Sequence, residues 1–199
     1  LTMELGAEQM IAGTHVNASI YLNNINDYIT TYRVSDGTYD NSVNDARVYK
    51  NVDATIWGYE LSLSRNLTKN VQTKLNLNYT NGNDDTQNRP LPQIMPFSGN
   101  LILDYETISS NYGVRLNFSD SQDRFDSRVL DTGKTGGYTT IDIFAGLELA
   151  PGMDLNFGIS NITDKRYSSH LSNANVLDAS ATKVDEPGRS IWGSVVYDF

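Results

Sequence analysis

Hydrophobic and polar side chains alternate one by one along most of this chain, and the alternation is clearest in residues 71–79. A period of two places successive side chains on opposite faces of a β-strand, whereas a helix needs apolar positions three and four residues apart. The pattern therefore predicts strands throughout and no helix. The nine predicted strands span residues 2–8, 14–32, 52–66, 71–79, 97–105, 112–119, 141–149, 153–160 and 188–199.

The connections between these strands alternate strictly between short and long. Short periplasmic turns and long extracellular loops are typical of outer-membrane barrels, whose strands give up every second position to a polar interior. We therefore expect an all-β fold, an antiparallel transmembrane β-barrel, and not a soluble β-sandwich. The short connections are 9–13, 66–70, 106–111 and 150–152, and the long ones are 33–49, 81–95, 120–137 and 161–187.

The last predicted strand carries an apolar face that ends on an aromatic residue. Val195, Tyr197 and Phe199 share this face, and we interpret them as an assembly signal for the barrel assembly machinery. If this strand runs inward, Phe199 lies on the periplasmic side and Leu1 on the extracellular side. Bacterial single-chain barrels close with an even number of strands, so nine strands predict that residues 1–199 are the C-terminal part of a larger barrel.

Composition narrows the function classes. The 199 residues carry a formal net charge of −9, which argues against a nucleic-acid partner because such proteins present basic patches. The chain has no cysteine, so it has no disulfide scaffold and no thiolate metal site. It also has no run of apolar residues long enough to predict a transmembrane helix.

We predict no catalytic residues and no enzymatic activity. His15 and His170 lie far apart without a His-x-x-x-His motif, and the Gly-x-Ser-x-Gly elbow is absent. His170 is the candidate for contact with a substrate or a metal, since imidazole suits copper, zinc and iron. The alternative for His170 is a solvated loop histidine.

Charged residues fall into two groups. Those on the polar face of the predicted strands are expected to line a wet lumen: Glu60, Lys74, Arg115, Asp142 and Glu148. Aspartates in the long loops are expected to form a solvated acidic surface, with lipopolysaccharide phosphates as partners through divalent ions. These are Asp36, Asp40, Asp45, Asp84, Asp85, Asp120, Asp123, Asp126, Asp131, Asp178 and Asp185.

Three pieces near the end of the chain, in this order, resemble the C-terminal end of TonB-dependent outer-membrane receptors. The resemblance implies a barrel of about 22 strands plugged by an N-terminal domain, with the plug absent from this chain. It also implies an integral outer-membrane location, energy from the TonB complex acting through the plug, and a transported metal ion or metal chelate in place of a resident cofactor. The motif residues are Asn161, Asp164 and Tyr167, then Pro187, Gly188 and Arg189, then the terminal Tyr197-Asp198-Phe199.

Residues 47–55, 82–96 and 167–171 look like the copper-receptor branch of that family. Iron-siderophore receptors share much of the pattern, so both substrates stay open. In the copper branch the metal-binding Cys, Met and His lie upstream of this region, and no position here inherits those roles. Two further alternatives are a small outer-membrane enzyme or adhesin and a passive porin.

Overall fold

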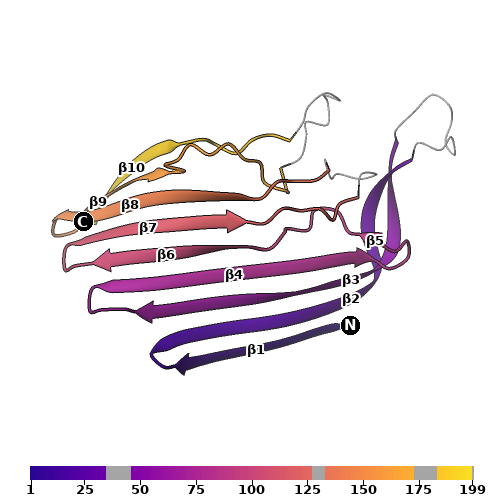
Figure 1. Cartoon of the computed structure of the whole chain (residues 1–199), viewed down its shortest axis with the longest axis horizontal. Helices are drawn as coiled ribbons and strands as arrows, with labels where there is room; N and C mark the ends of the chain where they lie inside the picture. Colours follow the sequence, from indigo (N-terminus) through magenta and orange to yellow (C-terminus); the bar gives the residue numbers. More distant parts are fainter. Residues whose placement is uncertain (35–45, 127–132, 173–182, 199) are drawn as a thin grey trace.

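The computed structural model is one antiparallel sheet, and the structure describes residues 1–34, 46–126, 133–172 and 183–198. Consecutive strands pair in the order β1-β2-β3-β4-β6-β7-β8-β9-β10, and the short β5 pairs with β4 (Figure 1). Among the described residues, no helix is long and apolar enough to cross a membrane. The strands are β1 Thr2–Ile11, β2 Thr14–Val34, β3 Ala46–Asn66, β4 Val71–Asp84, β5 Arg89–Pro90, β6 Ser98–Glu106, β7 Ser110–Ser119, β8 Tyr138–Ala150, β9 Met153–Ser160 and β10 Ser190–Tyr197.

All nine predicted strands are present in the predicted order, but several boundaries were wrong. β2 and β3 extend into the predicted loop 33–49, because their pairing resumes past a bulge at Asp27, which has a left-handed φ of 57°. The predicted turn 9–13 is in fact only Ala12 and Gly13, since β1 continues to Ile11. Residues 89–90, expected in a loop, form β5.

One face of the sheet is apolar, and few hydrophobic side chains in the described part of the chain are buried. A row of aliphatic residues crosses six strands through direct cross-strand pairs, and Leu101 in this row is 44% exposed. Exposed apolar surface is costly in water, at roughly 25 cal/mol per Å², but costs nothing against lipid. The row therefore fits a lipid-facing wall. It consists of Val16, Leu63, Leu75, Leu101, Leu116 and Ile141.

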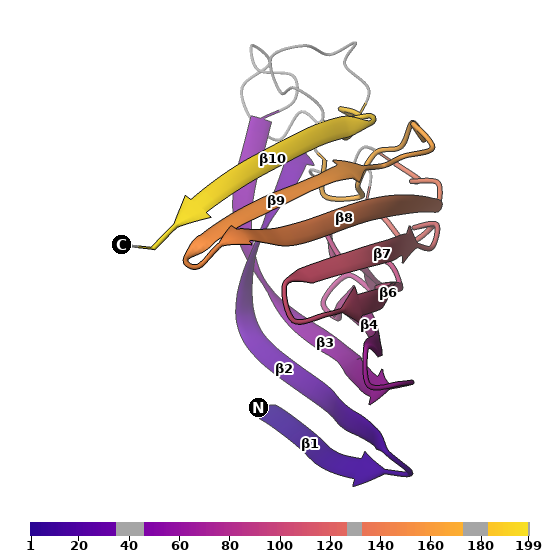
Figure 2. The same cartoon turned by 90° about the vertical axis from the view of Figure 1, so that its left-hand side faces the viewer.

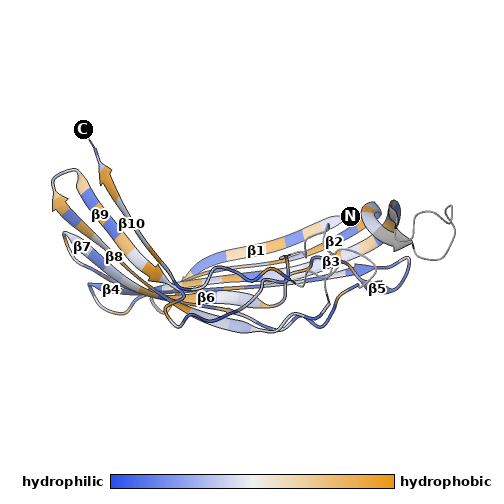
Figure 3. Ribbon diagram, turned by 90° about the horizontal axis from the view of Figure 1, so that it is seen from above, coloured by the Kyte–Doolittle hydropathy of each residue, from blue (hydrophilic) through white to orange (hydrophobic). Residues whose placement is uncertain are grey.

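The sheet is twisted and strongly curved, so that it has a concave and a convex face (Figures 2 and 3). Consecutive strands are antiparallel, so the short turns all lie at one end of the sheet and the longer connections at the other (Figure 1). β10 finishes at the short-turn end, where Asp198 N–H donates to the carbonyl of Gly152 at 2.8 Å. The Leu1 amino group lies at the opposite end, 2.6 Å from the carbonyl oxygen of Asn24.

Aromatic side chains flank the apolar row on both sides. Tyr105 and Tyr112 stack near the short-turn end with ring centroids 6.5 Å apart. Toward the other end, Tyr79 packs against Trp57 and Tyr59 at 5.4 and 5.5 Å. Tyr105 pairs with Val71, and the eight steps along β4 from there to Tyr79 cover roughly 27 Å. A strand tilted by about 40° then places the two aromatic groups close to the height of the apolar band of a membrane barrel.

Candidate functional site

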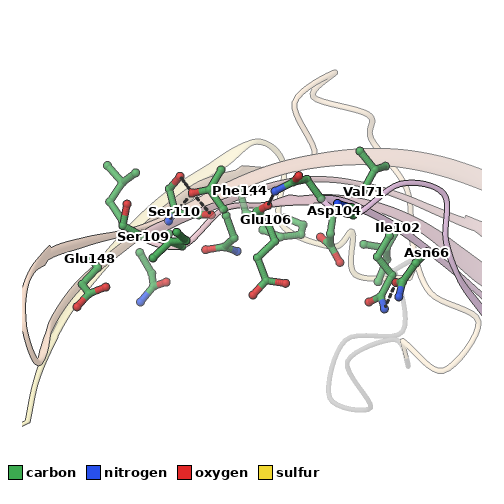
Figure 4. Close-up of a pocket in the computed structure, with 18 of the residues that line it drawn as sticks. Asn66, Val71, Ile102, Asp104, Glu106, Ser109, Ser110, Phe144 and Glu148 are labelled. Carbon is green, nitrogen blue, oxygen red and sulfur yellow. Dashed lines mark hydrogen bonds between the residues drawn. The ribbon is translucent and has the colours of Figure 1, made fainter.

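The polar face of the sheet is its concave face, from which Asp104, Glu106 and Glu148 project (Figure 4). It contains a hollow of about 740 Å³ near the short turns, formed by β4, β6, β7, β8 and β9. Alternation along the strands brings a polar side chain to this face at every second position. Its charged lining is nearly balanced, because four carboxylates face three cations. The carboxylates are Asp104, Glu106, Glu148 and Asp154, and the cations are Lys69, Lys74 and Arg115.

Cross-strand register places these charges beside suitable neighbours. Lys74 Nζ lies 3.8 Å from Asp104 Oδ2, and both side chains are partly solvated. The Arg115 guanidinium carbon stands 5.5 Å from the centroid of the Phe144 ring, a favourable cation–π distance. Each of these charges therefore has a favourable neighbour within the hollow. The hollow is still open to water or to another polar surface.

A ladder of amide and hydroxyl side chains continues the polar face toward the longer connections. Asn76 Nδ2 donates to Asn100 Oδ1 at 3.0 Å, and Ser62 Oγ donates to Asn76 Oδ1. Ser98 Oγ donates to Asn78 Oδ1 at 2.9 Å. A second hollow of about 410 Å³ lies along this ladder, with Glu60 in its wall. Side chains that bond to each other and to water suit a lumen, not a buried core.

The five charged residues expected on the lumen side all lie on this face. Glu60 lines the second hollow, and Lys74, Arg115 and Glu148 line the first. Asp142 is the direct cross-strand partner of Arg115, and its Oδ2 accepts from Asn117 Nδ2 at 2.9 Å. Alternation alone therefore assigned the face of each residue, while the cross-strand contacts were not predicted.

The structure brings the motif residues of the last long loop together. Asn161 is buried in a left-handed conformation with φ of 51°, and its side chain bonds to both the N–H and the carbonyl of Lys165 at 2.8 Å. Asp164 Oδ1 accepts from the backbone N–H of Arg189 at 2.8 Å. A Cβ on Gly188 would lie 2.7 Å from that same oxygen, so a larger residue there would push the carboxylate away from the Arg189 N–H.

Two more motif residues flank this contact. The Tyr167 ring stacks on Tyr138 with centroids 4.1 Å apart, and burial raises the pKa of the Tyr167 phenol. Pro187 is exposed just before the contact. The motif thus closes the long loop at its base and holds β9 beside β10. Of the predicted assembly signal, Val195 and Tyr197 are exposed on β10, and Phe199 lies outside the described residues.

His170 is not a solvated loop histidine, and that alternative was wrong. It is only 4% exposed, and its Nδ1 lies 2.9 Å from Thr135 Oγ1. Lys183 Nζ lies 3.4 Å from the same Nδ1 and also bonds to Thr135. An ammonium group in that position repels a second cation. The contacts join two long loops, and a role for His170 in substrate binding stays a prediction.

The solvated acidic surface was also wrong for two of the aspartates. Asp84 is buried and accepts a hydrogen bond from the Gln87 N–H at 2.9 Å. Asp126 is also buried, and its Oδ2 lies 3.1 Å from Arg89 Nη1. Within the described residues, no group of three His, Cys, Asp or Glu side chains is placed to hold a metal ion. Five of the predicted aspartates lie outside the described residues: Asp36, Asp40, Asp45, Asp131 and Asp178.

Sequence reasoning missed a cluster on the β1–β2 hairpin. His15 Nε2 lies 2.8 Å from Glu8 Oε1, and Met10 is the direct partner of His15 across the hairpin. The two-residue turn at Ala12 and Gly13 would have revealed this register. The longer turn expected there concealed it.

Comparison with known proteins assigns the fold. A family profile described as "TonB dependent receptor-like, beta-barrel" matches residues 1–162. The solved structure titled "Copper transporter OprC" superposes on the entire chain with a TM-score of 0.90 and 27% identity. The ferric enterobactin receptor PfeA of Pseudomonas aeruginosa gives a TM-score of 0.76 at 20% identity, and the ferric citrate transporter FecA gives 0.72 at 19%.

This chain covers 31%, 31% and 30% of those three chains, so it spans about a third of their length. No curated protein sequence matches it. The matched profile and the neighbours are receptors and transporters, which agrees with the resemblance read from the end of the sequence. The chain belongs to the TonB-dependent receptor-like β-barrel family.

Proposed function

We propose that this chain forms part of the wall of an outer-membrane receptor that imports a metal ion or metal chelate with energy from the TonB complex. The observation that carries the proposal is the match of residues 1–162 to the receptor barrel family. The exposed apolar row and the polar concave face support it, because a barrel wall needs lipid on one side and water on the other.

Copper is the metal we propose. The copper transporter OprC is 27% identical with a TM-score of 0.90, whereas the ferric enterobactin receptor PfeA reaches 20% and 0.76. Ferric siderophores are the second candidate, since two other structural neighbours, PirA and PiuA of Acinetobacter baumannii, are titled as siderophore receptors. The transported metal is cargo, and we propose no resident cofactor.

Within the described residues, β1 and β10 pair with β2 and β9 alone, so the sheet has two free edges. Unpaired backbone groups are costly in a bilayer, so membrane-spanning sheets close on themselves. We infer that further strands of the receptor pair with both edges and that a plug domain fills the lumen. The balanced charges of the 740 Å³ hollow are suited to a polar plug surface.

We place the short turns on the periplasmic side and the long loops outside, in contact with lipopolysaccharide. The C-terminal strand then ends at the periplasmic side, where the assembly machinery would meet Val195 and Tyr197. The motif contact of Asp164 with Arg189 would lie at the outer boundary of the wall. In this arrangement the chain contributes shape and polarity to transport and makes no covalent bonds.

The test compares a strain that lacks the encoding gene with the same strain carrying it on a plasmid. Cells receive a limiting amount of copper or of a ferric siderophore, and their metal content is measured by mass spectrometry. We expect the gene to raise cellular copper several-fold, and a protonophore to abolish the gain. Equal copper and iron in both strains would contradict import. A gain that survives the protonophore, together with steady conductance in planar bilayers, would indicate a porin.

A further inference from the structure

The hairpin between β1 and β2 sets a thioether beside an imidazole on the concave face. Ala12 and Gly13 have φ values of 48° and 77° and form a two-residue turn, so Met10 and His15 are direct cross-strand partners. Ile11 and Thr14, the pair next to this turn, exchange both of their backbone hydrogen bonds. The following pair is therefore the closer, non-hydrogen-bonded kind, with Cα atoms about 4.5 Å apart. One metal ion can reach both side chains.

Glu8 orients the imidazole of this pair. Its Oε1 lies 2.8 Å from His15 Nε2, and Glu8 lies two residues before Met10 on the same face of β1. When Nε2–H donates to the carboxylate, the free lone pair of His15 is on Nδ1. Histidines that ligate metals commonly donate their other ring N–H to a carboxylate, which fixes the tautomer and makes the ligand more basic.

The charges nearest the pair are acidic, and the nearest cation, Lys74, lies two strands away in the row of His15 and Ser64, 3.8 Å from Asp104 Oδ2. Glu4 and Glu60 project to the same face as Glu8. In residues 2–11, 14–25 and 54–66 no lysine or arginine does so, because Arg65 pairs with Thr14 on the opposite face. Met10 is 62% exposed, so an ion in the lumen can reach its sulfur.

We propose that Met10 and His15 bind a monovalent copper ion, with Glu8 holding the imidazole in the binding tautomer. Soft thioether ligands select Cu(I) over Mg²⁺, Ca²⁺ and other hard ions, and imidazole is a good copper ligand. The hairpin lies at the short-turn end of the concave face. If the receptor imports copper as proposed above, this site holds the ion where it leaves the lumen. The binding itself depends only on the hairpin.

The test uses the complete receptor purified from outer membranes in detergent. Cu(I) is titrated anaerobically against a chromophoric chelator, which reports the number of bound ions and their affinity. Met10→Leu and His15→Ala should each remove one bound ion or weaken it at least tenfold. Glu8→Gln should weaken the same ion by about tenfold. Met3→Leu is the matched control, because Met3 lies on the opposite face of the same strand and should keep every ion.

Wild-type stoichiometry and affinity in both Met10→Leu and His15→Ala would overturn the proposal. Met10 is exposed and His15 is half-buried, so we expect both variants to assemble. If one variant does not assemble, the result for the other variant decides. Copper uptake by cells is measured separately. A receptor that binds the ion at the hairpin but imports no copper contradicts the proposed function alone. Variants that bind as the wild type does contradict the hairpin site alone.

Discussion

Arg189 joins the end of the last long loop to its beginning through Asp164. The Arg189 backbone N–H donates to Asp164 Oδ1 at 2.8 Å, and its guanidinium Nη2 lies 3.7 Å from Oδ2. The ion pair is half exposed, so its charge contributes little, and the backbone hydrogen bond to the carboxylate is the larger contribution. The two residues lie 25 positions apart in sequence, and their contact sets where β10 begins beside β9.

Removing the acceptor of this bond should destabilise the base of the loop. Asp164→Ala is expected to cost about 1–2 kcal/mol, and Asp164→Asn less than about 1 kcal/mol because its amide oxygen still accepts from Arg189. The measurement is the temperature at which the folded receptor loses its compact electrophoretic form. Equal temperatures for the alanine and asparagine variants would show that the backbone bond contributes nothing.

The two faces of β4 can be compared with adjacent substitutions. Leu75 lies in the aliphatic row, and Asn76 lies in the polar ladder. Leu75→Arg should cost about 2–4 kcal/mol at the middle of the bilayer, while Asn76→Arg keeps its charge in water. We expect a large loss of folded receptor in the outer membrane for Leu75→Arg and a small one for Asn76→Arg. Equal yields would contradict the assignment of the faces.

Two glycines differ in the space that a methyl group would find. A Cβ on Gly58 would lie 2.3 Å from the carbonyl oxygen of Tyr79, which belongs to the backbone and cannot move aside. A Cβ on Gly193 would meet its nearest atom at 3.6 Å. Gly58→Ala should therefore lower stability by about 1–3 kcal/mol, and Gly193→Ala should have almost no effect. Thermal unfolding of both variants checks this, and a tolerated Gly58→Ala would refute the close approach.

The Asp185 carboxylate predicts a pH effect in the last loop. Hydrogen bonds from Ser168 and then Arg166 lower the pKa of Asp185 below its ordinary value of 3.8. Because the pKa of Asp185 is lower in the folded loop than in the unfolded chain, its hydrogen bonds stabilise the folded loop fully above about pH 4. This stabilisation disappears as the pH falls through the lowered value.

Nicking of the loop by pepsin, normalised to an unfolded substrate, measures this effect. The wild-type receptor should become more susceptible below pH 3.8. Asp185→Asn should be susceptible already at pH 5 and should change little with further acid. A wild-type loop whose nicking is the same at pH 5 and pH 2.5 would show that the carboxylate does not hold it.

The sequence was informative wherever a strand had to cross a membrane. Alternation at Lys74, Leu75 and Asn76 gave the correct face of each, because lipid on one side and water on the other impose a strict period of two. Outside the membrane this constraint ends. β2 and β3 continue there as a paired hairpin in which Tyr28 and Val48 pack against the buried Val52, so the predicted loop was too long.

The contacts of the candidate site could not be predicted from the sequence, for a different reason. The approach of Lys74 to Asp104 depends on the register of β4 against β6, and a shift of one residue in that register would place the two side chains on opposite faces. The burial of Asp126 beside Arg89 and of His170 beside Thr135 arises from packing between loops that are distant in sequence. No local pattern reports such packing.

Spin labels on β4 give the most direct measurement of the arrangement described above. A single label is placed in turn at positions 72 to 79 of the complete receptor in a bilayer, and its collisions with oxygen and with a water-soluble nickel complex are measured. We predict that labels at 73, 75, 77 and 79 favour oxygen and that labels at 72, 74, 76 and 78 favour nickel. Accessibility that does not alternate, or that alternates in the opposite phase, would contradict β4 as part of a wall between lipid and a wet lumen.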